Sequence, residues 1–296
     1  MRARRNMSLD DMFVPFPEAQ RGDAIEAYAA HLAARDGIPE VSSRILPHRE
    51  KTMARLAEDS CRFKGRIDPE LFLAYVQSAH LRHPPATRSL PRDLLFVFAC
   101  VRANTYEAYS VEKLIDTAHF VQETRQDRIN LTVMLEESYH TRFLLSVAEL
   151  FDLTVDAAPQ PPLVVRALIA GLGYLPRGIA HPLTLCAEIM GLALFVKLFE
   201  LAGTIFAAEP AMREAIEMRL GEVITDELGH ISYNRLQLRP AGLKAARMLL
   251  PVVASGSRHG LPGTEGLGLC PFPFAAMQNF PLGRLPRFIL DHAFIA

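Results

Sequence analysis

Cysteine is scarce in this sequence, and its spacing excludes several kinds of site. The 296 residues include four cysteines, Cys61, Cys100, Cys186 and Cys270, and no two of them form a CxxC pair. This argues against a zinc knuckle, a thioredoxin-like redox pair and a disulfide framework. We expect reduced thiols that are mostly buried.

Long apolar runs and an excess of one charge are also missing. No uninterrupted apolar stretch reaches the roughly 18 residues needed to span a bilayer, and the apolar residues 183–199 include Glu188 and Lys197. The basic N-terminus is not followed by the apolar segment of a secretory signal. The net charge of −1 lacks the basic excess of nucleic-acid-binding proteins. We therefore expect a cytoplasmic globular protein with neither a membrane nor a nucleic acid as partner.

Strand signals are sparse, whereas helical patterns recur along the chain. Asp68 and Pro69 are typical of a helix start, as is Pro210, and Gly37 is typical of a helix end. The predicted helices cover residues 23–35, 68–82, 90–116, 123–151, 183–206, 210–236 and 241–250.

These patterns predict a single all-α domain over residues 1–296. Residues 1–90 are expected to form N-terminal helices, residues 91–240 a four-helix core, and residues 241–296 a further helix and an irregular covering segment. The irregular part, residues 256–286, is rich in Gly, Pro and Phe, and it is too apolar for a disordered tail. We expect it to cover the core; for residues 270–288, a lid or a homodimer contact is the alternative.

One short motif occurs twice in the predicted core. Residues 136–140 read EESYH, and residues 226–230 read DELGH. Residues three apart lie on one face of a helix, so Glu137 points with His140, and Glu227 with His230. A carboxylate and an imidazole make half of a metal site. Two such helices, with one glutamate from each of two others, form the metal centre of di-iron and di-manganese bundles.

The two further glutamates are predicted from helix geometry. Residues that meet across an antiparallel pair of helices lie equally far from the turn. Glu107 and Glu137 have their midpoint at residue 122, between two predicted helices, and Glu188 and Glu227 have theirs just before Pro210. Glu200 misses this register by about 16 Å.

Glu112 is the rival of Glu107, but Glu107 shares an apolar stripe with Phe96, Cys100 and Ala103. The predicted metal ligands are therefore Glu107, Glu137, His140, Glu188, Glu227 and His230.

Electrostatics favours a metal at this position. Ionised glutamates gathered in a helical core are costly when unpaired, and two divalent cations balance four of them. The mixed N/O donor set suits iron or manganese better than calcium, and it lacks the thiolates of structural zinc. Glu136 and Asp226 each precede a predicted ligand, and we expect them to accept the ring N–H of a ligating histidine.

The full pattern resembles a known family. Glu107 is followed after 28 residues by EESYH, and Glu188 after 37 residues by DELGH. Over about residues 90–236 this resembles the duplicated motif of ferritin-like di-iron carboxylate oxygenases, and it is most similar to the p-aminobenzoate N-oxygenase type. Arylamine oxygenases of that type carry an extra histidine ligand where this chain has Val223, and aspartate is usual where it has Glu136. Acyl-carrier-protein desaturases have a similar pair of motifs.

The resemblance implies a ferritin-like four-helix di-iron bundle with extra N- and C-terminal helices. It implies two iron ions, with manganese as the alternative, that activate O2 to oxidise a small organic substrate. N-oxygenation of an amine is the first expectation, and acyl-chain desaturation or hydroxylation and a ferroxidase or iron-storage role are the alternatives. A substrate beside the metals would lie against apolar residues such as Val111, Met134, Leu192 and Val223.

The two electrons that this chemistry needs have no source within the chain. The sequence has no GxGxxG motif after a strand and no CxxC cluster for an iron–sulfur centre. We therefore expect an external electron donor, either a ferredoxin or a reductase.

Overall fold

Among the residues that the structure describes, regular structure is helical, apart from an isolated bridge between Ser8 and Pro281. The computed structural model describes residues 8–39, 44–78, 90–117, 124–155, 161, 163–172, 174–256, 261–278 and 280–296. Within them the α-helices are α1 Arg21–Asp36, α2 Pro47–Ala57, α3 Pro69–Ser78, α4 Arg92–Thr117, α5 Arg125–Glu149, α6 Leu163–Leu172, α7 Arg177–Ile205, α8 Pro210–Gln237, α9 Pro240–Gly256, α10 Phe274–Met277 and α11 Arg287–Leu290. The all-α prediction is confirmed.

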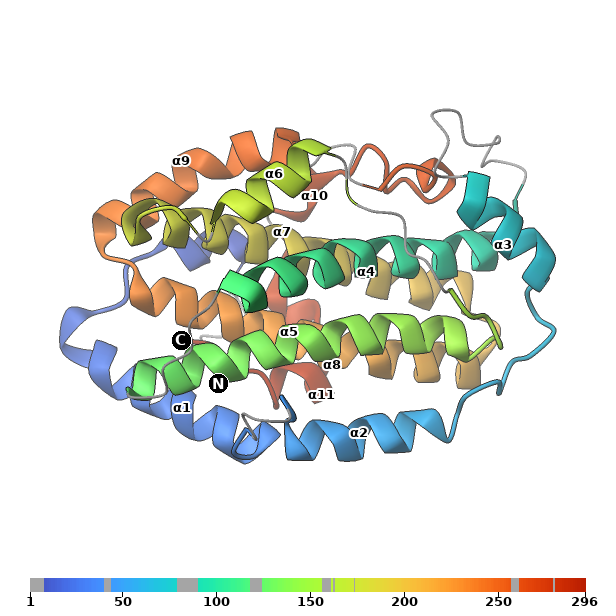
Figure 1. Ribbon diagram of the computed structural model, residues 1–296, viewed down its shortest axis with the longest axis horizontal. Coiled ribbons are helices and arrows are strands. Elements are labelled where there is room, and N and C mark those ends of the chain that lie inside the picture. The colour runs from blue at the N-terminus through green and yellow to red at the C-terminus, as the bar shows by residue number, and fades with distance from the viewer. Residues whose placement is uncertain are drawn as a thin grey trace.

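Four long helices, α4, α5, α7 and α8, form the centre of the molecule. Helix α4 packs on α5, α5 on α8, α8 on α7, and α7 on α4, which closes a ring of neighbours. Figure 1 shows α4 and α5 running side by side in opposite directions. Residues 118–123, in which we expected the turn between α4 and α5, lie outside the described residues. Helices α1 and α2 lie along α5 and α8 on one side, and α9 packs on α7.

Local signals set several helix ends as the sequence predicts. Gly37 ends α1 with a φ of 83°, a left-handed value that favours glycine. Asp68 caps α3, because its Oδ1 accepts the backbone N–H of Glu70 at 2.9 Å. Pro210 occupies the first turn of α8, where its missing N–H costs nothing. Thr124, which the sequence analysis did not single out, begins α5 with a reciprocal capping box.

Helices α2, α6, α10 and α11 were not predicted, and α7 and α9 are longer than expected. Helix α7 begins at Arg177, before Pro182, and α9 continues to Gly256. The C-terminal segment contains short helical turns, Glu265–Leu267, α10 and Leu282–Arg284. It buries Leu267, Phe274 and Leu282 against the main core.

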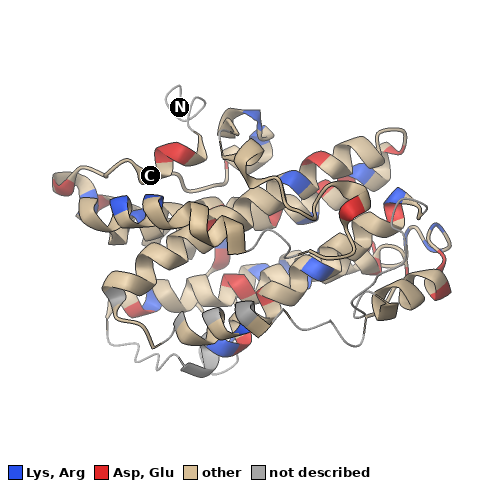
Figure 2. Ribbon diagram, turned by 90° about the horizontal axis from the view of Figure 1, so that it is seen from above, with Lys and Arg blue, Asp and Glu red and all other residues tan. Residues whose placement is uncertain are grey.

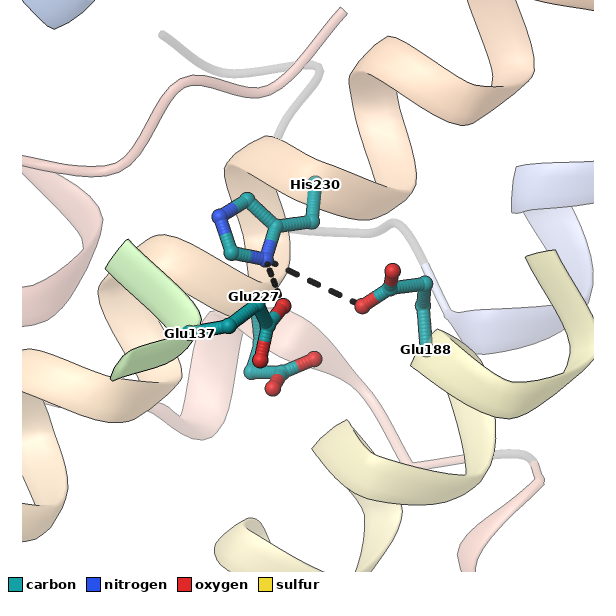
Figure 3. Close-up of side chains that lie close together, drawn as sticks. All are labelled: Glu137, Glu188, Glu227 and His230. Atoms are coloured by element: carbon teal, nitrogen blue, oxygen red, sulfur yellow. Dashed lines mark ion pairs between the residues drawn. The ribbon is translucent and has the colours of Figure 1, made fainter. Parts of the chain in front are cut away.

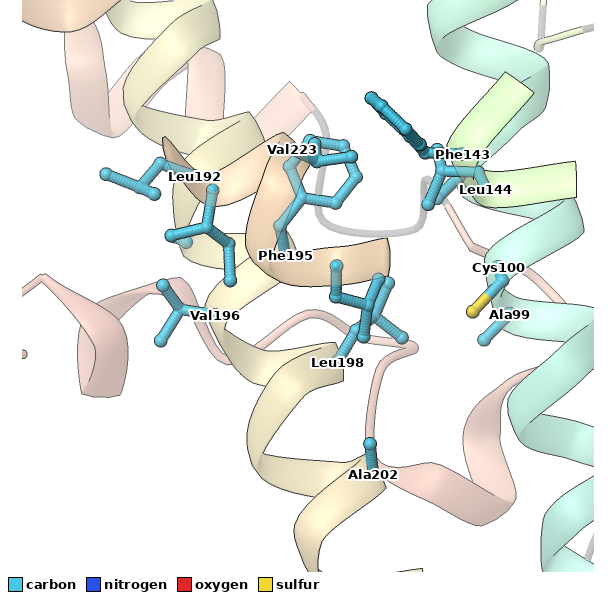
Figure 4. Close-up of a cluster of buried hydrophobic side chains, with 14 of the residues drawn as sticks. Ala99, Cys100, Phe143, Leu144, Leu192, Phe195, Val196, Leu198, Ala202 and Val223 are labelled. Atoms are coloured by element: carbon cyan, nitrogen blue, oxygen red, sulfur yellow. The ribbon is translucent and has the colours of Figure 1, made fainter. Parts of the chain in front are cut away.

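The interior is apolar around the centre of the four long helices. Figure 4 shows Phe143, Leu192 and Val223 among the side chains that fill it. All four cysteines are free; Cys61 is exposed and the other three are buried. Basic and acidic residues are interspersed along the helices (Figure 2). Among the described residues, no helix is long and apolar enough to cross a membrane.

Candidate metal centre

The six predicted ligands converge between the four long helices. Their ligand atoms form two groups, and within each group these atoms lie within 4.8 Å of one another. One group contains Glu107, Glu137 and His140, and the other contains Glu137, Glu188, Glu227 and His230. Figure 3 shows the second group, in which helices α5, α7 and α8 each direct a carboxylate towards His230 or its neighbours. Glu137 belongs to both groups.

The carboxylate of Glu137 lies between the two histidines. Its Oε2 is 3.2 Å from Nδ1 of His140, one helical turn away on α5. Its Oε1 is 2.8 Å from Nδ1 of His230, on α8. The same nitrogen of His230 lies 3.8 Å from Glu188, and Nδ1 of His140 lies 3.5 Å from Glu227. The Nδ1 atoms of both histidines thus face the glutamates.

The opposite edge of each imidazole faces one of two further acids, Asp226 and Glu136, which we call the outer acids. Nε2 of His140 lies 3.2 Å from Asp226, and Nε2 of His230 lies 3.0 Å from Glu136. Glu136 of α5 thus contacts the histidine of α8, and Asp226 of α8 contacts the histidine of α5. An ionised carboxylate only accepts hydrogen bonds, so Nε2 carries the hydrogen in both rings. In the neutral imidazole, the lone pair of Nδ1 then points at the glutamates.

This arrangement leaves buried polar atoms unsatisfied. Nδ1 of His140, Nδ1 of His230 and Oε2 of Glu227 have no hydrogen-bond partner among the described residues. A lone pair that faces carboxylate oxygens is unfavourable unless a proton or a metal ion lies between them. The donor atoms present therefore fit a metal ion, and the cluster could hold one.

Without a metal, protons must compensate the buried acids. Burial and the nearby Glu137 raise the pKa of Glu188 to about 7. The same two causes raise the pKa of Glu107 well above its ordinary value. Burial would lower the pKa of His140, but Glu137 and Asp226 together raise it to about 10. The metal-free centre therefore holds protons on groups that would release them to a metal.

The two rejected glutamates lie outside this cluster. Glu112 is 61% exposed and pairs with Lys113, and Glu200 is 42% exposed and lies 3.3 Å from Lys197. Both acids are thus on the surface of the same helices that carry Glu107 and Glu188. The register argument selected the inward-facing acid of each helix.

The centre has a closed side and a more open side. The side chains of both histidines are completely buried, whereas Glu137 and Glu188 are 15% and 14% exposed. Of the four predicted pocket residues, Leu192 and Val223 are completely buried, and Val111 and Met134 are half-buried. Two cavities of about 390 and 450 Å³ are lined by other residues.

Two arginines that the sequence analysis missed surround the outer acids. Arg49 lies 2.5 Å from Asp226 and 3.1 Å from Glu136. Arg35 lies 2.8 Å from Asp226 and 2.9 Å from Glu222. They come from α2 and α1, in the N-terminal region. The sequence did contain a signal for such arginines. Two divalent ions balance four glutamates, so the further acids Glu136 and Asp226 required positive charges from elsewhere in the chain.

No protein-family model, no curated protein and no solved structure matches this chain. The side chains of the centre are therefore the basis for a functional assignment.

Proposed function

We propose that this protein is a ferritin-like non-haem di-iron oxidoreductase that activates O2 to oxidise a small organic molecule. The observation that carries this proposal is the pair of ligand groups that share Glu137, each with one histidine whose Nδ1 faces carboxylates. Two Glu-x-x-His helices with one glutamate from each of two others are the ligand pattern of di-iron bundles. By resemblance to the p-aminobenzoate N-oxygenase type, we propose N-oxygenation of an amine to a hydroxylamine or nitro product.

The donor atoms support iron over other common metals. Calcium takes oxygen ligands only, and structural zinc favours thiolates. A set of carboxylates with two imidazoles suits iron, and manganese accepts the same donors. Bound iron would supply the redox chemistry with O2, and a separate ferredoxin or reductase would supply the electrons.

The residues of the chain would orient this chemistry and keep water away. Asp226 and Glu136 fix both histidines in the tautomer whose Nδ1 is free to bind metal. The buried side chains of Leu192 and Val223 exclude water from the neighbouring interior. The substrate would approach on the side of Glu137 and Glu188, because the histidine side is closed.

Elemental analysis tests the metal centre first. Protein loaded with Fe²⁺ under anaerobic conditions should retain about two irons per chain, as the two ligand groups require. Glu227→Ala should lose iron, whereas Glu200→Ala should retain it, because Glu200 is a surface residue of the same bundle. Full iron content in Glu227→Ala would contradict the ligand assignment.

Reaction with O2 separates the candidate activities. The reduced, iron-loaded protein is mixed with O2 in a stopped-flow instrument with and without p-aminobenzoate. An absorbing species that decays faster with the amine, together with hydroxylamine or nitro product, supports N-oxygenation. Conversion of an acyl chain to an alkene or alcohol would instead support the desaturase or hydroxylase alternative. Release of iron into a mineral would support storage.

A further inference from the structure

Arg49 is the most heavily paired side chain around the candidate centre. It is 2% exposed and projects from α2, outside the four long helices. Its Nε lies 2.6 Å from Asp36, and its Nη1 lies 2.9 Å from Glu222. Its Nη2 lies 3.1 Å from Glu136 and 2.5 Å from Asp226. One planar guanidinium thus contacts acids from α1, α5 and α8.

The Nη2 contacts connect both halves of the centre. Glu136 accepts from His230, and Asp226 accepts from His140. A single nitrogen of Arg49 is therefore two contacts away from each histidine. The fixed fork of a guanidinium can hold two carboxylates in one geometry, which a flexible ammonium group does less well. A movement of Arg49 would therefore move Glu136 and Asp226, and with them both imidazoles.

We infer that Arg49 is a positioning residue that couples the two metal positions. It holds Glu136 and Asp226 in register, and through them it orients His230 and His140 at the same time. This inference rests on the proposed di-metal centre. Loss of Glu136 or Asp226 would disturb mainly one histidine, whereas loss of Arg49 would disturb both.

Helix α2 is also attached to α5 by contacts that do not involve Arg49. Tyr139 on α5 donates a hydrogen bond of 2.6 Å to Glu50, and its hydroxyl accepts the backbone N–H of Leu46 at 3.3 Å. Arg142 also pairs with Glu50. Helix α2 thus has a second attachment to α5, one that does not involve the acids beside the histidines.

Arg219 provides a matched control for a buried arginine with a structural role. It is 1% exposed, like Arg49. Its guanidinium donates to Ser146 Oγ at 3.1 Å and to the carbonyls of Ala215 and Leu56 at 2.8 and 2.9 Å. Arg219→Gln should therefore destabilise the fold without disturbing either histidine.

The test measures anaerobic Co²⁺ binding by calorimetry in the full chain. In Arg49→Gln, the affinity for each of the two bound Co²⁺ ions should fall by about tenfold or more, which is the usual effect of removing a residue that orients a metal ligand. In Arg219→Gln, both affinities should stay within about twofold of those of the wild-type protein. Glu136→Gln should lower mainly the affinity for the Co²⁺ ion at His230. Asp226→Asn should lower mainly the affinity for the Co²⁺ ion at His140. The absorption bands of Co²⁺ report the change in ligand geometry independently of any enzymatic activity.

A second variant keeps the test decisive if Arg49→Gln does not fold. Asp36→Asn removes the charge that holds Nε of Arg49 and leaves every metal ligand in place, so it should also weaken both equivalents. Coupling is refuted if folded Arg49→Gln or Asp36→Asn binds both Co²⁺ ions as Arg219→Gln does, or loses only one. If the wild-type protein binds no Co²⁺, the proposed centre itself fails, and the coupling fails with it.

Discussion

Glu137 offers the sharpest test of the candidate centre, because it is the acid common to both ligand groups. Its two oxygens lie 3.2 and 2.8 Å from the Nδ1 atoms of His140 and His230. Glutamine has nearly the same shape, but its amide nitrogen cannot bind a metal ion. In Glu137→Gln, at least one of the two ligand groups that contain Glu137 therefore loses a carboxylate donor.

We expect Glu137→Gln to retain less than about half of the metal bound by the wild-type protein. The same substitution should destabilise the metal-free protein by about 3–5 kcal/mol, as for the removal of one partner of a buried ion pair. The reason is that Glu137 faces two imidazoles whose pKa values are raised, so each imidazole loses the carboxylate nearest its Nδ1. Metal content is measured by elemental analysis, and stability by denaturant unfolding in chelator.

Glu200→Gln is the matched control for this experiment. It makes the same chemical change in an acid of α7 that is 42% exposed and paired with Lys197, where ion pairs contribute little. Its metal content and stability should equal those of the wild-type protein. Two metal ions per chain in Glu137→Gln, or an equal loss in Glu200→Gln, would refute the role of Glu137.

Three further outcomes follow from the same contacts. His140, whose pKa is raised to about 10, and His230, whose pKa is also raised, hold protons at neutral pH. Metal must displace these protons and those that burial keeps on Glu107 and Glu188, so the affinity for metal should fall by at least about 100-fold per pH unit as the pH is lowered below 7. Calorimetry in buffers of different ionisation enthalpy detects this as at least about two released protons. Tyr139→Phe removes the 2.6 Å hydrogen bond to Glu50 and should cost about 1–2 kcal/mol of unfolding free energy, with unchanged metal content. Leu192→Ala in the buried core should cost about 2–5 kcal/mol by the same denaturant assay, because it leaves a cavity.

Most of the longer helices could be predicted because their signals are local. The apolar period, Asp68, Pro210 and Gly37 each act within a few residues, and the structure has helix boundaries close to those positions. Helix α2 escaped because its sequence, PHREKTMARLA, has only two buried residues, Arg49 and Leu56. Its helical state depends on contacts with α5 and α1, which no local pattern reveals.

The six clustered side chains could be predicted because helix geometry is regular. Spacing from a turn selected Glu188 over Glu200, and the inward stripe selected Glu107 over Glu112; the cluster contains the first acid of each pair. The histidine partner of each outer acid, in contrast, could not be predicted from the sequence. The sequence placed Glu136 and Asp226 near a histidine, but the exchange between helices depends on the packing of α5 against α8.

The charges explain why the N-terminal helices belong to the centre. Four inner glutamates face the space where two divalent ions would lie, so those ions do not neutralise Glu136 and Asp226 as well. Both outer acids face the Nε2 atoms of the histidines, and Arg35 and Arg49, with Asp36 and Glu222, form the surrounding layer. Arg35 and Arg49 hold the pKa of Asp226 well below its ordinary value, although burial would raise it. Helices α1 and α2 thus supply the arginines that keep Asp226 ionised beside His140, a histidine that could bind a metal.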